Sequence, residues 1–264
     1  MASFQSGPFT LSFDDIVPPD NERGVVVLVH GFASNRAENW RRLGWYGAFE
    51  RAGYRVIAPD MRGHGMSDKP HDPQAYGRDQ MAGDVLALMD HLDLRGATLM
   101  GYSMGAHLAL SAALSAPDRI DRLILGGIGG RMLSPQTAPK PAMSLAEALM
   151  SEDPDVIIDP VQKGFRRFAE AQGDDRAALA ACSQGHGETP GRAALSALTI
   201  PTLIVAGAQD QLAGDPAVLA GAIPGAKAVT LPACDHFSAI PHALFKAAVF
   251  DFLEGWEDEG PVFE

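Results

Sequence analysis

Short apolar runs rich in β-branched residues recur along the chain, separated by stretches long enough to hold a helix. The run Val25–Val29 is the clearest, because five consecutive apolar residues suit a strand that is buried on both faces, as in a parallel sheet. Near the N-terminus, Phe9, Leu11 and Phe13 alternate with polar or small residues, which predicts an edge strand. Further strands are predicted at Tyr54–Ala58, Ala97–Met100, Arg122–Leu125, Thr202–Ala206 and Ala228–Leu231.

Helical periodicity follows several of these runs. Apolar residues recur at helical spacing in Met81–Leu94 and in Ala239–Leu253, and Ala106–Leu114 has the small apolar residues of a buried helix. Strands that alternate with helices are typical of βαβ units. The pattern therefore predicts an α/β fold with a mostly parallel, doubly wound sheet and helices on both faces.

The alternation stops between residues 131 and 198, where no run reads as a strand. Helix-length pieces at Ser144–Met150, Pro160–Gln172 and Asp174–Cys182 are separated there by Pro, Gly and Asp. A long insertion without strands in a parallel-sheet pattern is typical of a helical cap. We expect a cap at 131–198 and a core at 1–130 and 199–264; ordinary surface helices are the alternative.

Composition excludes several classes of function. The 264 residues carry 21 Lys and Arg against 33 Asp and Glu, a net charge of −12, which argues against a broad nucleic-acid surface. Two cysteines cannot form a disulfide framework, and no apolar run reaches the length of a membrane span. The eight histidines lack metal-ligand spacing, and no nucleotide-binding motif is present. We therefore expect a cytoplasmic protein with no cofactor, metal, membrane or nucleic-acid partner.

The candidate nucleophile lies in the sequence Gly101-Tyr102-Ser103-Met104-Gly105, between a predicted strand and a predicted helix. A serine raised on a tight strand-to-helix turn takes a strained backbone and needs small neighbours. The Gly-x-Ser-x-Gly pattern alone also fits a flexible glycine turn. Its position between strand and helix favours a nucleophile elbow.

A serine hydroxyl needs a base that accepts its proton. His236 follows the last predicted strand and precedes the last predicted helix, so it is the candidate base. His242 is the competitor, but it falls inside the predicted helix Ala239–Leu253, where it should be less able to reach Ser103.

The base in turn needs a carboxylate that holds its tautomer. Asp210 follows the strand Thr202–Ala206 and is the candidate acid, with Asp215 as an alternative. Asp235 adjoins the histidine, and neighbouring side chains rarely meet in the required geometry. The order Ser, Asp, His along the chain matches the order in α/β-hydrolases.

Two backbone N–H groups could bind a developing oxyanion. Met104 follows the nucleophile at the start of a helix, where the helix dipole favours negative charge. Phe32 lies in the loop after Val25–Val29, where Gly31 allows the backbone to turn inward. We interpret His30 as a structural residue of this loop.

With these residues in place, the chain resembles the α/β-hydrolase superfamily, in its serine-nucleophile, esterase-like branch with a small helical cap. The resemblance rests on His30-Gly31-Phe32, Arg62-Gly63-His64-Gly65-Met66-Ser67 with Pro70, Gly101–Gly105, Gly207–Asp210 and Asp235-His236, which occur in order and cover the chain outside the cap. It implies Ser103, Asp210 and His236 as a triad and the N–H groups of Phe32 and Met104 as an oxyanion hole.

The type of nucleophile excludes some branches of the superfamily. Haloalkane dehalogenases and epoxide hydrolases carry aspartate at the elbow, whereas this chain carries Ser103. Carboxylesterases, lactonases, carbon–carbon bond hydrolases, perhydrolases and some acyltransferases share one triad, which therefore cannot separate them.

We expect a hydrolase of a small carboxylic ester. A carbon–carbon bond hydrolase or lactonase with the same triad is the alternative, and a catalytically silent ligand-binding protein is the alternative of another class. Trp40, Met132 and Met143 are candidate pocket residues, although each could instead serve core packing. The natural substrate and the oligomeric state stay open.

Overall fold

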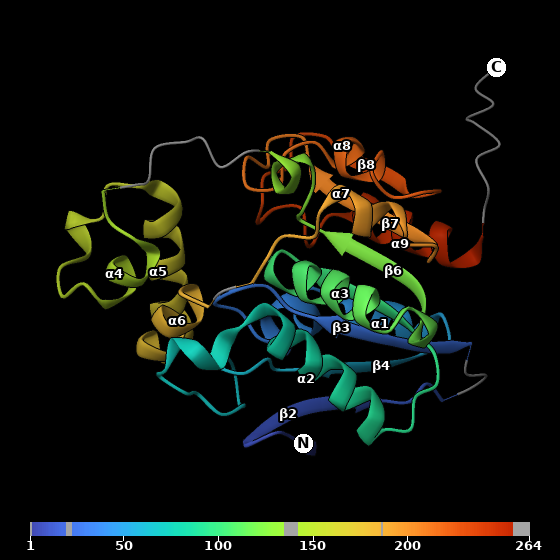
Figure 1. Ribbon diagram of the computed structural model, residues 1–264, viewed down its shortest axis with the longest axis horizontal. Helices are drawn as coiled ribbons and strands as arrows, with labels where there is room; N and C mark the ends of the chain where they lie inside the picture. The colour runs from blue at the N-terminus through green and yellow to red at the C-terminus, as the bar shows by residue number, and fades with distance from the viewer. Residues whose placement is uncertain (1, 20–22, 135–141, 186, 256–264) are drawn as a thin grey trace.

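An eight-stranded sheet with the strand order β1-β2-β4-β3-β5-β6-β7-β8 forms the centre of the computed structural model, which describes residues 2–19, 23–134, 142–185 and 187–255 (Figure 1). The strands are β1 (Ala2–Ser6), β2 (Phe9–Ile16), β3 (Gly24–Val29), β4 (Tyr54–Pro59), β5 (Ala97–Tyr102), β6 (Ile120–Gly126), β7 (Thr202–Gly207) and β8 (Lys227–Leu231). Strands β3 to β8 pair in parallel, and β2 pairs antiparallel with both β1 and β4. The predicted mostly parallel sheet is confirmed.

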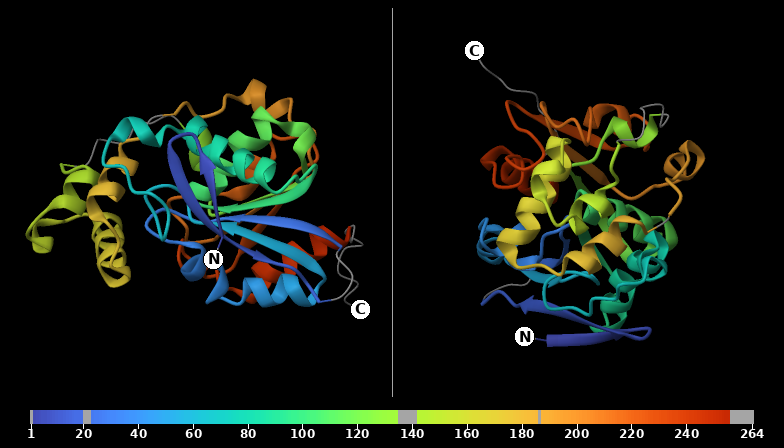
Figure 2. Two further views of the ribbon diagram at one scale, coloured as in Figure 1. Left: turned by 90° about the horizontal axis from the view of Figure 1, so that it is seen from below. Right: turned by 90° about the vertical axis from the view of Figure 1, so that its left-hand side faces the viewer.

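Helices cover both faces of this sheet (Figure 2). The helices are α1 (Trp45–Arg51), α2 (Arg78–His91), α3 (Met104–Ser115), α4 (Leu145–Met150), α5 (Pro160–Gln172), α6 (Arg176–Ser183), α7 (Arg192–Ser196), α8 (Pro216–Ala220) and α9 (Ala243–Glu254). Short helical turns are η1 (Ala37–Arg41, a π-helix), η2 (Pro73–Tyr76), η3 (Pro117–Arg119), η4 (Gly130–Leu133) and η5 (Pro154–Val156). Buried side chains of α2, α3 and α8 form one core layer, and those of α1 and α9 form the other. No helix in the described part of the chain is long and apolar enough to cross a membrane.

The first strand, β1, is absent from the sequence-based prediction. Its residues are mostly exposed, and only Phe4 and Ser6 are buried, so the segment lacks the apolar run that marked the other strands. The hairpin forms because Gly7 has a φ of 57°, which lets the chain reverse between Ser6 and Phe9. The Ser6 hydroxyl then donates to Asp84 Oδ1 at 2.5 Å and fixes the hairpin against α2.

Helices α4, α5 and α6 form a separate lobe beside the sheet, here called the cap lobe (Figure 1). Its small core contains Leu149, Ala169, Leu179 and Ala180. Two elements of the predicted insertion, α7 and η4, lie on the main core instead: Leu195 of α7 is buried in it, and Met132 and Leu133 of η4 pack against it. Residues 135–141 and 186 of the predicted cap lie outside the described residues.

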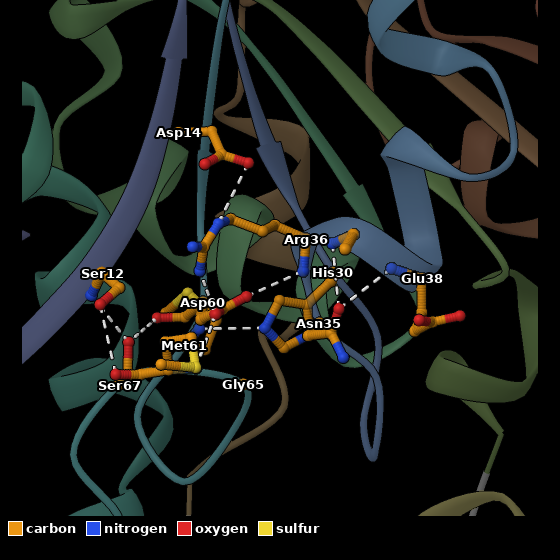
Figure 3. A network of polar contacts seen from close by, with 12 residues as sticks. Ser12, Asp14, His30, Asn35, Arg36, Glu38, Asp60, Met61, Gly65 and Ser67 are labelled. Carbon is orange, nitrogen blue, oxygen red and sulfur yellow. Dashed lines mark hydrogen bonds and ion pairs between the residues drawn. The ribbon is translucent and has the colours of Figure 1, made fainter. Parts of the chain in front are cut away.

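A buried polar network connects the loops that follow β3 and β4 (Figure 3). Arg36 forms ion pairs with Asp14 and Asp60, and its backbone N–H also donates to Asp60 Oδ1 at 2.9 Å. The second Asp60 oxygen accepts from the N–H of Met66 at 2.8 Å. Gly65 has a φ of 51°, and a Cβ there would lie 2.1 Å from the Asp60 carboxylate. The motif containing Gly65 therefore serves to wrap backbone around a buried carboxylate.

This network generates a stability prediction. Asp60→Ala removes the partner of a buried guanidinium, so we expect the free energy of unfolding to fall by about 3–5 kcal/mol. The matched control is Asp90→Ala, whose ion pair with Arg119 is largely exposed and should contribute at most about 1 kcal/mol. Urea titrations at pH 7 measure both losses. Equal losses in the two variants would contradict a central role for Asp60.

Candidate active site

Ser103 lies between β5 and α3 in a backbone conformation that few residues adopt. Its φ of 53° and ψ of −114° place it in a strained region for a residue with a side chain. The turn is fixed by the Ser103 N–H, which donates to the carbonyl of Gly126 at 2.8 Å. This sharp turn raises the serine hydroxyl above the carboxyl ends of the parallel strands, as a nucleophile elbow does.

Both glycines of the pentapeptide are required by the close approach of backbone segments. A Cβ on Gly101 would lie 2.1 Å from the carbonyl oxygen of Gly105. A Cβ on Gly105 would lie 2.0 Å from the carbonyl oxygen of Val29, at the end of β3. The sequence analysis expected small residues next to the nucleophile, and a Cβ at either glycine would indeed clash with a backbone carbonyl.

The structure brings Ser103, His236 and Asp210 together in one chain of hydrogen bonds. His236 Nε2 lies 2.9 Å from Ser103 Oγ, and His236 Nδ1 lies 2.7 Å from Asp210 Oδ2. The other oxygen of Asp210 accepts from the N–H groups of Leu212 and Ala213 at 3.0 and 2.9 Å. Because the carboxylate is buried and held by the backbone, it can hold the imidazole in one tautomer with Nε2 toward the serine.

Tyr102 supports the histidine in a way the sequence analysis missed. Its hydroxyl donates to the backbone carbonyl of His236 at 2.5 Å, and the two rings are 5.4 Å apart. Burial raises the pKa of the Tyr102 hydroxyl well above its usual value, and nearby Asp210 adds to the rise, so the group stays a proton donor. The clue in the sequence was its position, directly before the candidate nucleophile.

The alternative residues have other tasks. Helix α9 begins at Ala243 rather than at the predicted Ala239, and His242 caps it by accepting from the N–H of Leu244. Asp215 caps α8 through the N–H of Ala217. Asp235 accepts from the N–H and the hydroxyl of Ser238, and these bonds lower its pKa. None of the three contacts the Ser103 hydroxyl.

Phe32 and Met104, the proposed oxyanion donors, belong to two segments that border Ser103. A Cβ on Gly31 would lie 3.6 Å from Ser103 Cβ, so the loop after β3 passes beside the nucleophile. The Gly31 N–H donates to Asn39 Oδ1 at 3.0 Å, and the N–H of Phe32 has no acceptor among the described residues. Met104 opens α3, where the first N–H groups have no partner within the helix.

His30 and the nearby His64 are buried structural residues. His30 Nε2 accepts from the N–H of Met61 at 2.9 Å, and its Nδ1 bonds to the carbonyl of Gly31. Burial lowers the pKa of His30 to about 4 and that of His64 to about 3. Both rings are therefore neutral at pH 7, and His30 ties the loop after β3 to the loop after β4 (Figure 3).

A cavity of about 230 Å³ opens onto Ser103 and His236. Its other lining residues are Phe32, Ser34, Glu38, Asn39, Leu43, Tyr102, Phe165, Phe168, Phe237 and Ile240. Four phenylalanines from three segments make most of the wall aromatic. This volume is small for a ligand pocket, so it suits a compact substrate.

Three residues predicted for this pocket lie elsewhere, and the prediction is corrected. Trp40 is fully buried and packs edge-on against Trp45 in the core between α1 and the sheet. Met132 packs against the core layer on the opposite face of the sheet. Met143 is not among the described lining residues, and its carbonyl accepts from Gln162 of α5 inside the cap lobe.

Phe165 of α5 joins the cap lobe to the core over the site. Its ring lies 5.4 Å from that of Phe32 and 6.0 Å from that of Phe237. Phe237 in turn lies edge-on to the His236 ring at 5.6 Å. Sequence reasoning missed these phenylalanines, because it identified Pro160–Gln172 only as a helix-length piece of the insertion and did not predict which of its residues face the site.

The described residues do not form a metal centre. Across the described ranges, no group of three or more His, Cys, Asp or Glu side chains is placed to hold a metal ion. The groups placed for chemistry at the cavity are instead the Ser103 hydroxyl and the His236 imidazole. Such a set supports nucleophilic attack on a polarised carbonyl.

Comparisons with known proteins agree with this geometry. The family model described as "alpha/beta hydrolase fold" matches residues 24–184. The chain is 30% identical to a 2-hydroxymuconate semialdehyde hydrolase of Pseudomonas sp. (strain CF600), over 86% of each chain. It is 44% identical to an epoxide hydrolase of Caballeronia sordidicola, but only over 36% of this chain and 28% of that protein. The crystal structure of the enol-lactonase from Burkholderia xenovorans LB400 superposes with a TM-score of 0.70, at 26% identity, covering 96% of this chain and all of that one.

The hydrogen-bond chain generates a prediction about the reactivity of Ser103. A fluorophosphonate probe should label Ser103, and Asp210→Asn should slow labelling at least about 100-fold, because the histidine loses the group that orients it. Asp215→Asn is the matched control and should label at the wild-type rate. Mass spectrometry of the labelled peptide over time measures both. A larger loss of labelling rate in Asp215→Asn than in Asp210→Asn would show that Asp210 is not the acid.

Proposed function

The chain belongs to the α/β-hydrolase family, and from that premise we propose that it is a serine hydrolase that cleaves a small, uncharged carboxylic ester. One observation carries the proposal: the hydrogen-bonded series Ser103–His236–Asp210 opens directly into the 230 Å³ cavity. The chain carries Ser103 at the elbow, where a mechanism with an aspartate nucleophile would require an aspartate.

In the proposed reaction, His236 Nε2 accepts the proton of Ser103 as Oγ attacks the ester carbonyl. The N–H groups of Phe32 and Met104 donate to the oxyanion, which is stabilised by their fixed positions. His236 then donates the proton to the leaving alcohol, and an acyl-enzyme forms on Ser103. Water, deprotonated by the same histidine, attacks the acyl-enzyme and releases the acid.

A carbon–carbon bond hydrolase or a lactonase is the second candidate. It is favoured by the likeness to a 2-hydroxymuconate semialdehyde hydrolase and an enol-lactonase. Two names contain a carboxylate: that of the 2-hydroxymuconate semialdehyde hydrolase, and that of a 3-oxoadipate enol-lactonase that is 31% identical over 60% of this chain. No lysine or arginine lines the cavity among the described residues, whereas Glu38 does. A cavity lined by a carboxylate and by no lysine or arginine therefore favours an uncharged ester as the substrate.

The nucleophile is tested by Ser103→Ala. We expect the turnover of p-nitrophenyl butyrate to fall by about 10⁶-fold, to the background rate, because no other group can form the acyl-enzyme. The unfolding temperature should stay close to the wild-type value, since the substitution removes only one half-buried hydroxyl. Ser196→Ala, an exposed serine in α7, is the control and should keep full activity. Retained turnover in Ser103→Ala would refute the mechanism.

The substrate class is tested by a panel of uncharged esters, uncharged lactones and carboxylated keto acids. We expect kcat/KM to be highest for short-chain esters and to fall as the acyl chain outgrows the cavity. Carboxylated substrates should be disfavoured because Glu38 lines the cavity, whereas its ion-pair partner Arg42 does not. A higher kcat/KM for a vinylogous keto acid would instead favour the carbon–carbon bond hydrolase.

A further inference from the structure

The cavity has one polar wall among its aromatic ones. Ser34, Glu38 and Asn39 line it and all come from the segment that follows the oxyanion loop. The remaining lining residues, apart from Ser103 and His236, are apolar or, in the case of Tyr102, already use their polar group. The catalytic mechanism does not require any of these three side chains to be polar toward the substrate.

Asn39 has an unused hydrogen-bond donor. Its Oδ1 accepts from the Gly31 N–H, which fixes the orientation of the amide. Its Nδ2 is buried and has no partner among the described residues. An unpaired buried donor costs free energy, so a site that keeps one is suited to a ligand that supplies an acceptor.

Glu38 and Ser34 add acceptor capacity beside this donor. The Glu38 side chain is only 16% exposed, and the residue's backbone is held by an N–H bond to Asn35 Oδ1 at 3.0 Å (Figure 3). Its carboxylate is paired with Arg42, whose side chain is mostly exposed. Ser34 is 6% exposed, and its hydroxyl makes no hydrogen bond among the described residues.

A further carboxyl group, that of Asp174, interacts with Glu38 of this wall. Asp174, at the base of the cap lobe, is half-buried, and its carboxyl has a buried oxygen without a partner in the described chain. Burial raises its pKa to about 6, and the neighbouring carboxylates of Asp60 and Glu38 add to the rise against the opposing charge of Lys69. A second carboxylate, brought by a ligand, would meet the same repulsion.

We propose that the wall formed by Ser34, Glu38 and Asn39 binds a hydroxyl group of the substrate, so that the enzyme prefers hydroxylated esters to plain ones. The hydroxyl oxygen accepts from Asn39 Nδ2, and the hydroxyl proton is donated to the Glu38 carboxylate. A hydroxyl is the compact neutral group that satisfies a donor and an acceptor together. This inference rests on the proposed ester hydrolysis and specifies the substrate of that same site.

The test compares kcat/KM for ethyl butyrate, ethyl 3-hydroxybutyrate, 2-hydroxyethyl butyrate, monoethyl succinate and the ethyl ester of β-alanine in a pH-stat at pH 7. These esters differ mainly in the presence, position and charge of one polar group. We expect one of the two hydroxyl esters to exceed ethyl butyrate by about tenfold, because sites that hydrogen-bond a hydroxyl discriminate against substrates that lack it. Monoethyl succinate should be the poorest substrate.

A substitution assigns the preference to the polar wall. Glu38→Met keeps the size of the side chain and removes the acceptor, so the ratio of hydroxyl ester to ethyl butyrate should fall to about one. The control Glu152→Met changes an exposed glutamate of the cap lobe and should leave the ratio unchanged. If Glu38→Met folds poorly, the ratio of kcat/KM for the hydroxyl ester to that for ethyl butyrate in the wild-type enzyme still tests the proposal.

The failures of the two proposals are distinguishable. Turnover of ethyl butyrate at the rate of both hydroxyl esters would overturn the hydroxyl site and leave the serine hydrolase in place. Preference for the β-alanine ester would overturn it as well, because the wall would then recognise a cation. No turnover of any ester would overturn the proposed function, and the hydroxyl site with it.

Discussion

The structure depends on the close approach of three backbone segments at the start of α3. The first turn of this helix touches the ends of β3 and β5, and only the missing side chains of Gly101 and Gly105 leave room for it. This contact places the serine, holds Met104 beside it at the start of the helix, and brings the loop after β3 alongside. A shift of the helix by one side chain would separate the nucleophile from the loop that carries Phe32.

The strain of this turn is offset by bonds that surround it. Ser103 keeps its unusual φ because its N–H is held by Gly126 and because α3 packs deeply against the sheet. Around it, buried groups with single fixed roles, such as neutral His30 and the Tyr102 hydroxyl, connect the loops that carry the site. Rigid loops reduce the reorganisation that a charge-separating reaction requires.

The parallel strands and the order of the catalytic residues could be predicted because both depend on local pattern. Apolar runs mark buried strands, and Ser103, Asp210 and His236 each follow one. The hairpin strand Ala2–Ser6 could not be predicted, since its burial comes from long-range contact with α2. The pocket residues were predicted wrongly, because Asn39 lines the cavity and its neighbour Trp40 is buried in the core. Which of the two faces the cavity depends on the orientation of one short helix. A single helical turn shows too little hydrophobic periodicity to predict that orientation.

Phe165 has a consequence for how such an enzyme changes its range over evolution. Its ring bridges two core loops from a lobe that is also attached to the core through contacts such as the His71–Asp175 pair, which lies away from the cavity. The dimensions of the cavity are thus set by the relative orientation of lobe and core as much as by the residues that line it. Substitutions in the contacts between lobe and core can therefore change which substrates fit the cavity without changing any residue that lines it. Substrate selectivity can then evolve while the reacting groups stay fixed.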